Sequence, residues 1–496
     1  MSSIIQIQGF KFSIIHYAGV FIGIISTLLI YPQDLNLYGF YGFLTNAASL
    51  LSPIVSLGFG FVMLRYFPHY RAEGTPTNSV FLRFIYSGYC IGIISFTILF
   101  ICTSGFIADY FFKHDNLVLN HLIYLLPLTI LFVVFEFMTN WSITHKEIAL
   151  PAILSTSLKI ILPTLFLLVI HKSIGYQGFL YCLMTYYIII IFLILRFLAT
   201  KEKLLPGIHS DLTSNLNKRE LIQFAIYSMV TGTSVVLSLR IDSLMITSHI
   251  GTEANGKFSM IYFISNAAFI PAHAIYEILS PYIARHSKEN SSSSIQSMYE
   301  KSVRNMLIPT LWASLCLYFC YDDLMKILPH GEKLASLKYS LCLLLIARVI
   351  DAATGVNHHI LNFSKHYRIE LVLLIILAFS NILFNLYFIP QFGIFGAALG
   401  TMISVSIFNI SKSVIIYLKM GYYPFDNRFY KILIYSTLLI LILSILPHCG
   451  NSLAQIIIIG SLTSLLFLFA ILRLGISEEL KAWIYKSTES LFRKSK

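Results

Sequence analysis

Ionisable side chains inside long apolar stretches are the residues of this sequence whose types and spacing could do chemistry. Arg240 and Asp242 stand two positions apart in the run LSLRIDSLMI. Positions i and i+2 of a helix do not face each other, so these charges cannot neutralise one another well. Arg348 and Asp351 stand at i and i+3 and share a helix face. Lys159 is a third cation within an apolar stretch.

A cation in a low-dielectric cavity can replace the water around a phosphate or pyrophosphate group. We therefore expect Arg240, Arg348 and Lys159 to be substrate-binding residues that line a polar cavity. The alternative is that such charges clamp neighbouring helices together. Asp242, Asp351 and His16 are candidates for binding a coupling proton or Na⁺, or for a structural role, since a buried histidine often serves packing.

The elements that hold these charges must be membrane helices. Of the 496 residues, 57% are hydrophobic and only 12% are charged, and the mean hydropathy is +0.76. Apolar stretches of about 20 residues recur, which is the length that crosses a bilayer as a helix. The sequence thus predicts an all-α integral membrane protein with about 14 spans. Their expected ranges are 12–31, 40–63, 81–106, 119–140, 150–170, 176–197, 221–248, 257–281, 304–321, 339–360, 370–389, 394–418, 430–447 and 453–474.

The distribution of basic residues orients these spans. With the N-terminus inside, 26 of the 35 Lys and Arg residues fall in cytoplasmic segments and 6 in outer ones. This asymmetry predicts that both termini are cytoplasmic. The net charge of +12 then reflects topology and attraction to anionic lipid, not nucleic acid. Arg65 and Arg285 flank the inner mouth, where they bind substrate or simply anchor the helix ends.

A weak internal repeat divides the chain. The run IGYQGFLYCLM (174–184) resembles FGIFGAALGTM (392–402) at an offset of 218, and TNAA (45–48) resembles SNAA (265–268) at an offset of 220. We expect spans 1–6 and 7–12 to be two six-helix lobes related by a parallel pseudo-two-fold axis, although chance similarity among membrane helices is the alternative. The expected domains are 1–198 (N-lobe), 199–220 (cytoplasmic linker), 221–418 (C-lobe), 419–474 (spans 13 and 14) and 475–496 (basic cytoplasmic tail). The segment 286–301 is expected to be an exposed cytoplasmic loop.

Several motifs resemble one family. YPQDLNLYGFYGFL, LSPIVSLGFG, RIDSLMITSHIGTEANGKFS and FGIFGAALGTMIS are similar to the O-antigen and polysaccharide flippases of the multidrug/oligosaccharidyl-lipid/polysaccharide exporter superfamily. The resemblance implies a two-lobed transporter of the bacterial inner membrane. It would move a polyprenyl-pyrophosphate-linked oligosaccharide, such as an O-antigen, capsule or exopolysaccharide repeat unit, to the periplasmic leaflet by alternating access.

Two other functions remain open. A cation-coupled multidrug antiporter of the same superfamily would favour acidic groups in its cavity, and a membrane-embedded polysaccharide polymerase or acyltransferase would need a large outer loop or a catalytic His/Asp pair. We expect no enzyme activity, no metal and no cofactor beyond a coupling H⁺ or Na⁺. The expected partners are the lipid-linked oligosaccharide, the bilayer, a polysaccharide polymerase and glycosyltransferases. The chain is expected to act as a monomer without nucleic acid.

Overall fold

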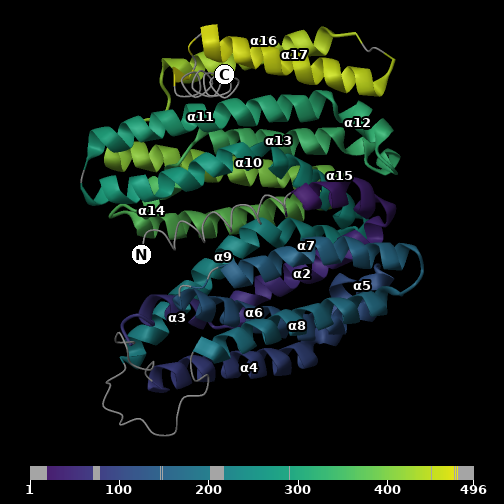
Figure 1. Cartoon of the computed structure of the whole chain (residues 1–496), viewed down its shortest axis with the longest axis vertical. Coiled ribbons are helices and arrows are strands. Elements are labelled where there is room, and N and C mark those ends of the chain that lie inside the picture. The colour runs from purple at the N-terminus through teal and green to yellow at the C-terminus, as the bar shows by residue number, and fades with distance from the viewer. Residues whose placement is uncertain are drawn as a thin grey trace, which may run out of the picture. The chain divides into compact units, whose positions relative to one another are not determined.

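The structure is a computed structural model in which the chain folds into α-helices (Figure 1). It describes residues 19, 21–70, 79–145, 147, 149–201, 217–289, 291–447, 450–473, 475, 477 and 478. The chain forms two compact units, residues 1–256 and 257–496. Most of the predicted linker and of the C-terminal tail lies outside the described residues. The division into two repeated lobes stays a prediction.

The first unit is built from membrane-length helices joined by short turns. A π-helical turn (η1, Ser26–Ile30) and a 3-10 turn (η2, Tyr31–Gln33) precede α2, and η3 (Leu122–Tyr124) joins α5 to α6. The helices are α2 (Leu35–Val55), α3 (Phe59–Tyr66), α4 (Ser79–Phe111), α5 (Asn116–His121), α6 (Leu125–Thr144), α7 (Ala149–Ile170), α8 (Tyr176–Lys201) and α9 (Lys218–His249).

Helix α2 is the centre of the first unit. It begins at an N-cap, Asp34, whose carboxylate accepts a hydrogen bond from the Leu37 amide at 2.9 Å. It packs along α9 on one side and α6 on another, and α6 in turn packs on α8. Phe40 and Leu44 of α2 are fully buried in the resulting core. This packing places α9, which carries Arg240 and Asp242, against α2.

The second predicted span is bent. Helices α2 and α3 meet at an angle of 61° across a break of a few residues. Leu57 and Gly58 at the break both have positive φ, 50° and 72°, so the chain turns there through the left-handed region. The bend creates two helix directions within one span, and both α2 and α3 contact α6 and α9.

The second unit contains the remaining helices. Helix α10 (Thr252–Lys288) begins in the first unit and continues into the second. The others are α11 (Ser292–Phe319), α12 (Tyr321–Ile327), η4 (Gly331–Lys333), η5 (Ala335–Leu337), α13 (Lys338–Ala353), α14 (Asn357–Asn362), α15 (Tyr367–Met420), α16 (Asn427–Ile445) and α17 (Ser452–Arg473).

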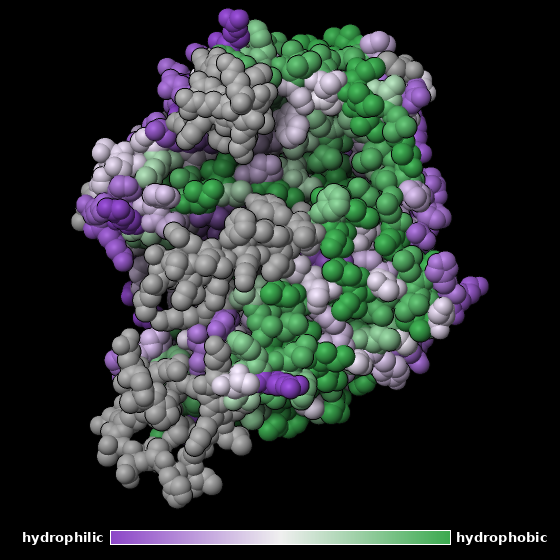
Figure 2. All heavy atoms as spheres, in the orientation of Figure 1, coloured by the Kyte–Doolittle hydropathy of each residue, from purple (hydrophilic) through white to green (hydrophobic). Residues whose placement is uncertain are grey.

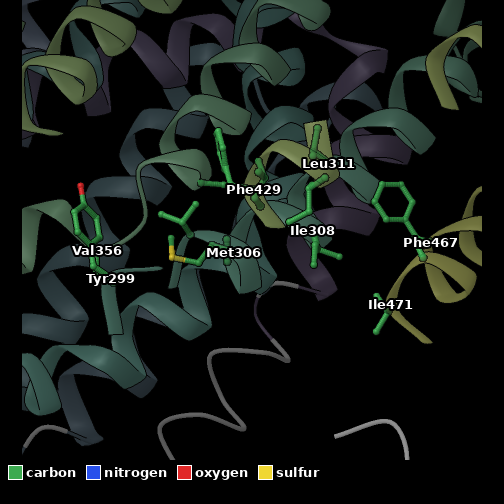
Figure 3. Close-up of a cluster of buried hydrophobic side chains, with 14 of the residues drawn as sticks. Tyr299, Met306, Ile308, Leu311, Val356, Phe429, Phe467 and Ile471 are labelled. Carbon is green, nitrogen blue, oxygen red and sulfur yellow. The ribbon is translucent and has the colours of Figure 1, made fainter. Parts of the chain in front are cut away.

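The core of the second unit joins α11 to the last two helices. In Figure 3, Met306, Ile308 and Leu311 of α11 lie near Phe429 of α16 and Phe467 of α17, all members of one buried hydrophobic cluster. Helix α11 also packs on α13, which packs on α15. The helix that carries Arg348 and Asp351, α13, is therefore held between α11 and α15.

Helix α15 is two spans joined by a kink. It runs for 54 residues, but Gly393 within it has φ 57° and ψ −131°, a conformation that residues with a side chain rarely adopt. The predicted spans 370–389 and 394–418 lie on either side of this glycine. Gly175, its predicted repeat partner, directly precedes α8.

The helices have the length and polarity of membrane spans. Within the described residues, nine helices are long and apolar enough to cross a bilayer, or up to eleven if each bent pair forms one span. Large apolar side chains such as Ile91, Ile98 and Phe106 of α4 are more than half exposed, as expected of a surface in contact with lipid. Figure 2 shows hydrophobic side chains (green) over much of the visible face. The predicted all-α membrane fold is confirmed.

One expectation is wrong. The segment predicted to be an exposed loop, 286–301, is mostly helical, because α10 continues to Lys288 and α11 already begins at Ser292. The serine-rich sequence favoured a loop, but it contains two side chains that pack into the core. These are Ile295 and Tyr299, which stand one helical turn apart. Their spacing was the available signal for a helix.

Candidate functional site

The first unit contains a large apolar cavity. It has a volume of about 760 Å³ and is lined by side chains of α2, α3, α6, α8 and α9. Most of the lining is aromatic or aliphatic, including Phe61, Phe132 and Tyr187. Glu136 of α6 is the acidic residue in this lining, and the Ser52 hydroxyl of α2 donates a hydrogen bond to its Oε2 at 2.6 Å. The cavity can hold an apolar group beside one carboxyl group.

Arg240 and Asp242 point in different directions from α9. Asp242 is only 3% exposed and stands beside Ser243, whose hydroxyl accepts a hydrogen bond from Asn46 of α2 at 2.9 Å. Arg240 is exposed and lies close enough to Tyr41 of α2 to interact with it electrostatically. One charge is buried and the other is exposed, so the two lie on different faces of the helix, as their spacing predicts.

Lys159 lies on α7 against the beginning of the described chain. Its Cδ and Nζ atoms would lie 3.0 and 3.3 Å from a Cβ atom added at Gly19. The glycine therefore leaves the space in which the half-buried lysine side chain sits. His16, the predicted ionisable residue of the same segment, lies outside the described residues.

Arg348 and Asp351 form an ion pair on α13. The Arg348 Nη1 atom donates to Asp351 Oδ2 at 2.9 Å, and both side chains are largely buried. Arg348 also lies over the ring of Tyr262 of α10, 5.5 Å from its centre. The second carboxylate oxygen, Oδ1, accepts a hydrogen bond from Asn409 of α15 at 2.5 Å. The shared helix face predicted from the i, i+3 spacing is confirmed, and both Asp351 oxygens are occupied.

A second charged cluster lies beside this pair and was missed by the sequence analysis. Lys412 and Glu370 of α15, 4% and 3% exposed, place Nζ and Oε1 3.9 Å apart. His358 of α14 approaches the same Glu370 oxygen at 2.6 Å. Lys412 falls inside the predicted span 394–418, and that position was the signal that it is buried.

The two clusters border a polar cavity of about 270 Å³ in the second unit. Its lining combines cationic, acidic, histidine and amide side chains with a few apolar ones. The polar lining residues are His273, Tyr276, Asp351, Asn357, His358, Asn409 and Lys412. Unlike the apolar cavity, this one has a buried cation in its wall.

The predicted inner-mouth arginines are both exposed. Arg65, in the last turn of α3, stacks over the Phe224 ring of α9 with its guanidinium 4.4 Å from the ring centre. Arg285 of α10 donates a hydrogen bond from Nε to Glu289 at 2.8 Å. This bond lowers the pKa of Glu289 below its ordinary value. Neither arginine is enclosed in the way that Lys412 is.

In the part of the chain that the structure describes, no group of three or more His, Cys, Asp or Glu side chains is placed to hold a metal ion. Arg348 with Asp351 and Lys412 with Glu370 instead bring opposite charges together.

The family profile named "Polysaccharide biosynthesis protein" matches residues 34–287, just over half of the chain. The chain belongs to the polysaccharide biosynthesis protein family. The match covers the bent α2–α3 span, the apolar cavity and α9 with Arg240 and Asp242. Among proteins of curated function, none matches the chain by sequence.

Solved structures place this family member in a transporter fold. The lipid II flippase MurJ in an inward closed conformation superposes with a TM-score of 0.71 at 14% identity, over 94% of this chain and 99% of that chain. An inward-facing multidrug resistance MATE family transporter of the MOP superfamily gives a TM-score of 0.61 at 12% identity, over 81% and 93%. The similarity runs through nearly the whole chain, so the protein is a multi-pass membrane protein with the fold of these transporters.

Proposed function

We propose that the protein is a flippase of the bacterial inner membrane for a polyprenyl-pyrophosphate-linked oligosaccharide. It carries an O-antigen, capsule or exopolysaccharide repeat unit from the cytoplasmic to the periplasmic leaflet by alternating access, with both termini in the cytoplasm. The observation that carries the proposal is the match to the polysaccharide biosynthesis family in a chain with the fold of a lipid II flippase. Glycosyltransferases would supply the substrate and a polymerase would consume it.

The arrangement of charge supports an anionic lipid head group as the cargo. Three cations, Lys159, Arg240 and Arg348, lie inside the predicted membrane spans. Each cation at the centre of a membrane helix costs about 3 kcal/mol to insert. Such residues therefore line a substrate pathway or form ion pairs with other side chains. Arg348 has its acidic partner, whereas Arg240 is exposed on α9. We therefore assign the first contact with the pyrophosphate to Arg240.

The apolar cavity of the first unit supports the same cargo from the side of the lipid. Its wall of aromatic and aliphatic side chains suits an isoprenoid chain better than a sugar, whose hydroxyl groups would lose hydrogen bonds there. Cations suit the diphosphate head group and apolar side chains suit the isoprenoid tail, so the two features together fit a lipid diphosphate.

The test is a strain that lacks this gene. Surface glycan should disappear, and lipid-linked repeat units should accumulate in the cytoplasmic leaflet. A glycan-cleaving enzyme added to the outside of spheroplasts should therefore fail to cleave them. Return of the wild-type gene should restore both. Normal surface glycan in the deletion strain, with repeat units fully accessible from outside, would contradict the proposal.

A second function has one observation in its favour. Glu136 places a carboxyl group in an apolar, aromatic cavity, the chemistry that suits a lipophilic cation, and the fold is also that of a multidrug transporter. In that case the deletion strain should become sensitive to lipophilic cations while its glycan stays normal. Glu136→Gln should reproduce the sensitivity.

A further inference from the structure

The side chain of Lys412 has unused hydrogen-bonding capacity in an enclosed place. An ammonium group can donate three hydrogen bonds. Lys412 is 4% exposed and lines the 270 Å³ cavity, yet its contacts to the described residues are the Glu370 carboxylate at 3.9 Å and the Phe408 ring at 3.9 Å. The first is longer than a hydrogen bond and the second is not one. The cavity thus has an enclosed cation whose N–H donors lack a close acceptor among the residues that the structure describes.

The acidic groups around Lys412 are engaged elsewhere. Asp351 lines the cavity, but its Oδ1 accepts from Asn409 and its Oδ2 from Arg348. Glu370 Oε1 is bound by His358 at 2.6 Å, and its Oε2 has no hydrogen-bond partner among the described residues. Glu370 is also absent from the lining, so it offsets the lysine charge from behind the cavity wall.

We propose that this cavity is an oxyanion site in which Lys412 binds a phosphate group of a diphosphate ligand. What the site needs is an acceptor that carries negative charge, because the lysine donors are open while the Asp351 oxygens are already occupied. A phosphate oxygen supplies that acceptor as a charge-assisted hydrogen bond, the stronger kind. His358 and His273 stand in the same wall and can donate further bonds.

The size of the cavity limits the ligand. A volume of about 270 Å³ lies just below the range of roughly 300–1,000 Å³ typical of pockets for drug-sized ligands. It suits a phosphate or diphosphate head group rather than a whole lipid-linked oligosaccharide. The inference rests on the proposed function for its natural ligand, a lipid diphosphate, and a free diphosphate shares the same chemistry.

Glu370 gives the site a second property. As the nearest opposite charge of Lys412, it competes electrostatically with any bound anion. Removing its charge should therefore strengthen anion binding, whereas removing the lysine should weaken it. A purely structural lysine would not make anion affinity rise when Glu370 loses its charge.

The experiment measures binding to the purified full-length protein. The probes are farnesyl diphosphate, inorganic pyrophosphate and, as the uncharged control, farnesol. Lys412→Met should weaken binding of both diphosphates by about tenfold or more, the loss expected for a charge-assisted hydrogen bond, and leave farnesol binding unchanged. Lys412→Arg should keep most of the affinity. Glu370→Gln should raise it several-fold.

Two matched variants guard against misfolding. Lys419→Met removes an exposed lysine from the last turn of the same helix and should change nothing. The double variant Lys412→Met/Glu370→Gln removes both charges, so no carboxylate is left buried without its cation. If this folded double variant binds farnesyl diphosphate as tightly as the Glu370→Gln variant does, the oxyanion site is refuted.

The other outcomes distinguish a lipid head group from a free anion as the ligand, and they test the oxyanion site separately from the flippase function. Tighter binding of farnesyl diphosphate than of pyrophosphate supports a lipid head group, and the reverse supports a free anion; both keep the site at Lys412. Na⁺ binding in this cavity that is lost in Asp351→Asn, without any diphosphate binding, would overturn it. Diphosphate binding lost in Lys412→Met, with normal glycan in a deletion strain, would keep the site and reject the flippase.

Discussion

The ionisable residues within the helices fall into two kinds. Arg348 pairs with Asp351 and lies over the Tyr262 ring, so its charge is balanced within the second unit. For Arg240 the structure gives proximity to Tyr41 and exposure, but no ion pair to a described residue. Removing one partner of a buried ion pair leaves the other charge uncompensated and destabilises the fold, so such charges belong to the packed structure. A cation without such a partner is better suited to meet a ligand.

The first prediction follows at Arg240. Arg240→Ala should abolish glycan export while the protein still inserts and folds, because the pyrophosphate loses a cation and no buried acid loses its partner. Arg240→Lys should keep part of the activity, since a point charge still binds phosphate but lacks the bidentate geometry of a guanidinium. The measurement is surface glycan divided by the amount of folded protein in the membrane.

A structural role for Arg240 gives the opposite pattern. Arg240→Ala would then reduce the amount of folded protein, and export per folded molecule would stay normal. Arg428→Ala, which changes a partly exposed arginine paired with Glu478, serves as the control for the loss of an arginine in general.

Helix packing in the first unit depends on close backbone approach. A Cβ atom at Gly39 of α2 would come within 1.8 Å of the Thr252 carbonyl oxygen, and one at Gly256 within 2.1 Å of the Leu35 oxygen. The Asn255 side chain donates to the Gly39 oxygen at 2.8 Å, and Asp115 accepts from the Thr252 amide at 2.6 Å. Small residues allow this contact between helices, as is common in membrane bundles.

The second prediction tests that contact. Gly39→Ala should lower the melting temperature of the purified protein, because the added methyl group forces two backbones apart at a cost of about 1–3 kcal/mol or more. Gly105→Ala in α4 is the matched control: a Cβ there meets nothing within 4 Å, and alanine favours a helix by up to about 1 kcal/mol. Equal melting temperatures for the two variants would contradict the prediction and would show that the α2 backbone can shift to accommodate the methyl group at little cost.

The topology of the whole chain follows from its basic residues and stays a prediction. Glu289, between α10 and α11, should lie in the cytoplasm, and Glu332, between α12 and α13, in the periplasm. Both side chains are exposed, 46% and 74%, so a cysteine at either position can react with a reagent in water.

The third prediction uses these two positions. In a variant with all seven native cysteines replaced, Glu332→Cys should react with a membrane-impermeant maleimide in intact cells. Glu289→Cys should react only after the cells are permeabilised. The opposite pattern would reverse the orientation, and labelling of both in intact cells would change the number of spans between them.

Local sequence was enough for features that depend on one helix. Hydropathy predicted an all-α membrane protein because every spanning segment must satisfy its own backbone hydrogen bonds in lipid. The helical repeat predicted that Arg348 and Asp351 share a face and that Arg240 and Asp242 do not. The motifs likewise led to the family: three of the four lie in or overlap the region that the profile matches, whereas FGIFGAALGTMIS lies beyond it.

Contacts between helices were decided only by the tertiary structure. Glu370 meets Lys412, 42 positions later in the sequence, and Glu136 meets Ser52 from another helix. Which residues meet depends on how each helix is rotated and on where glycines such as Gly39 and Gly393 let backbones approach or turn. Hydropathy and periodicity describe one helix at a time, so neither could place Lys412 in the wall of a polar cavity: that required the packing of α14 and the kinked α15.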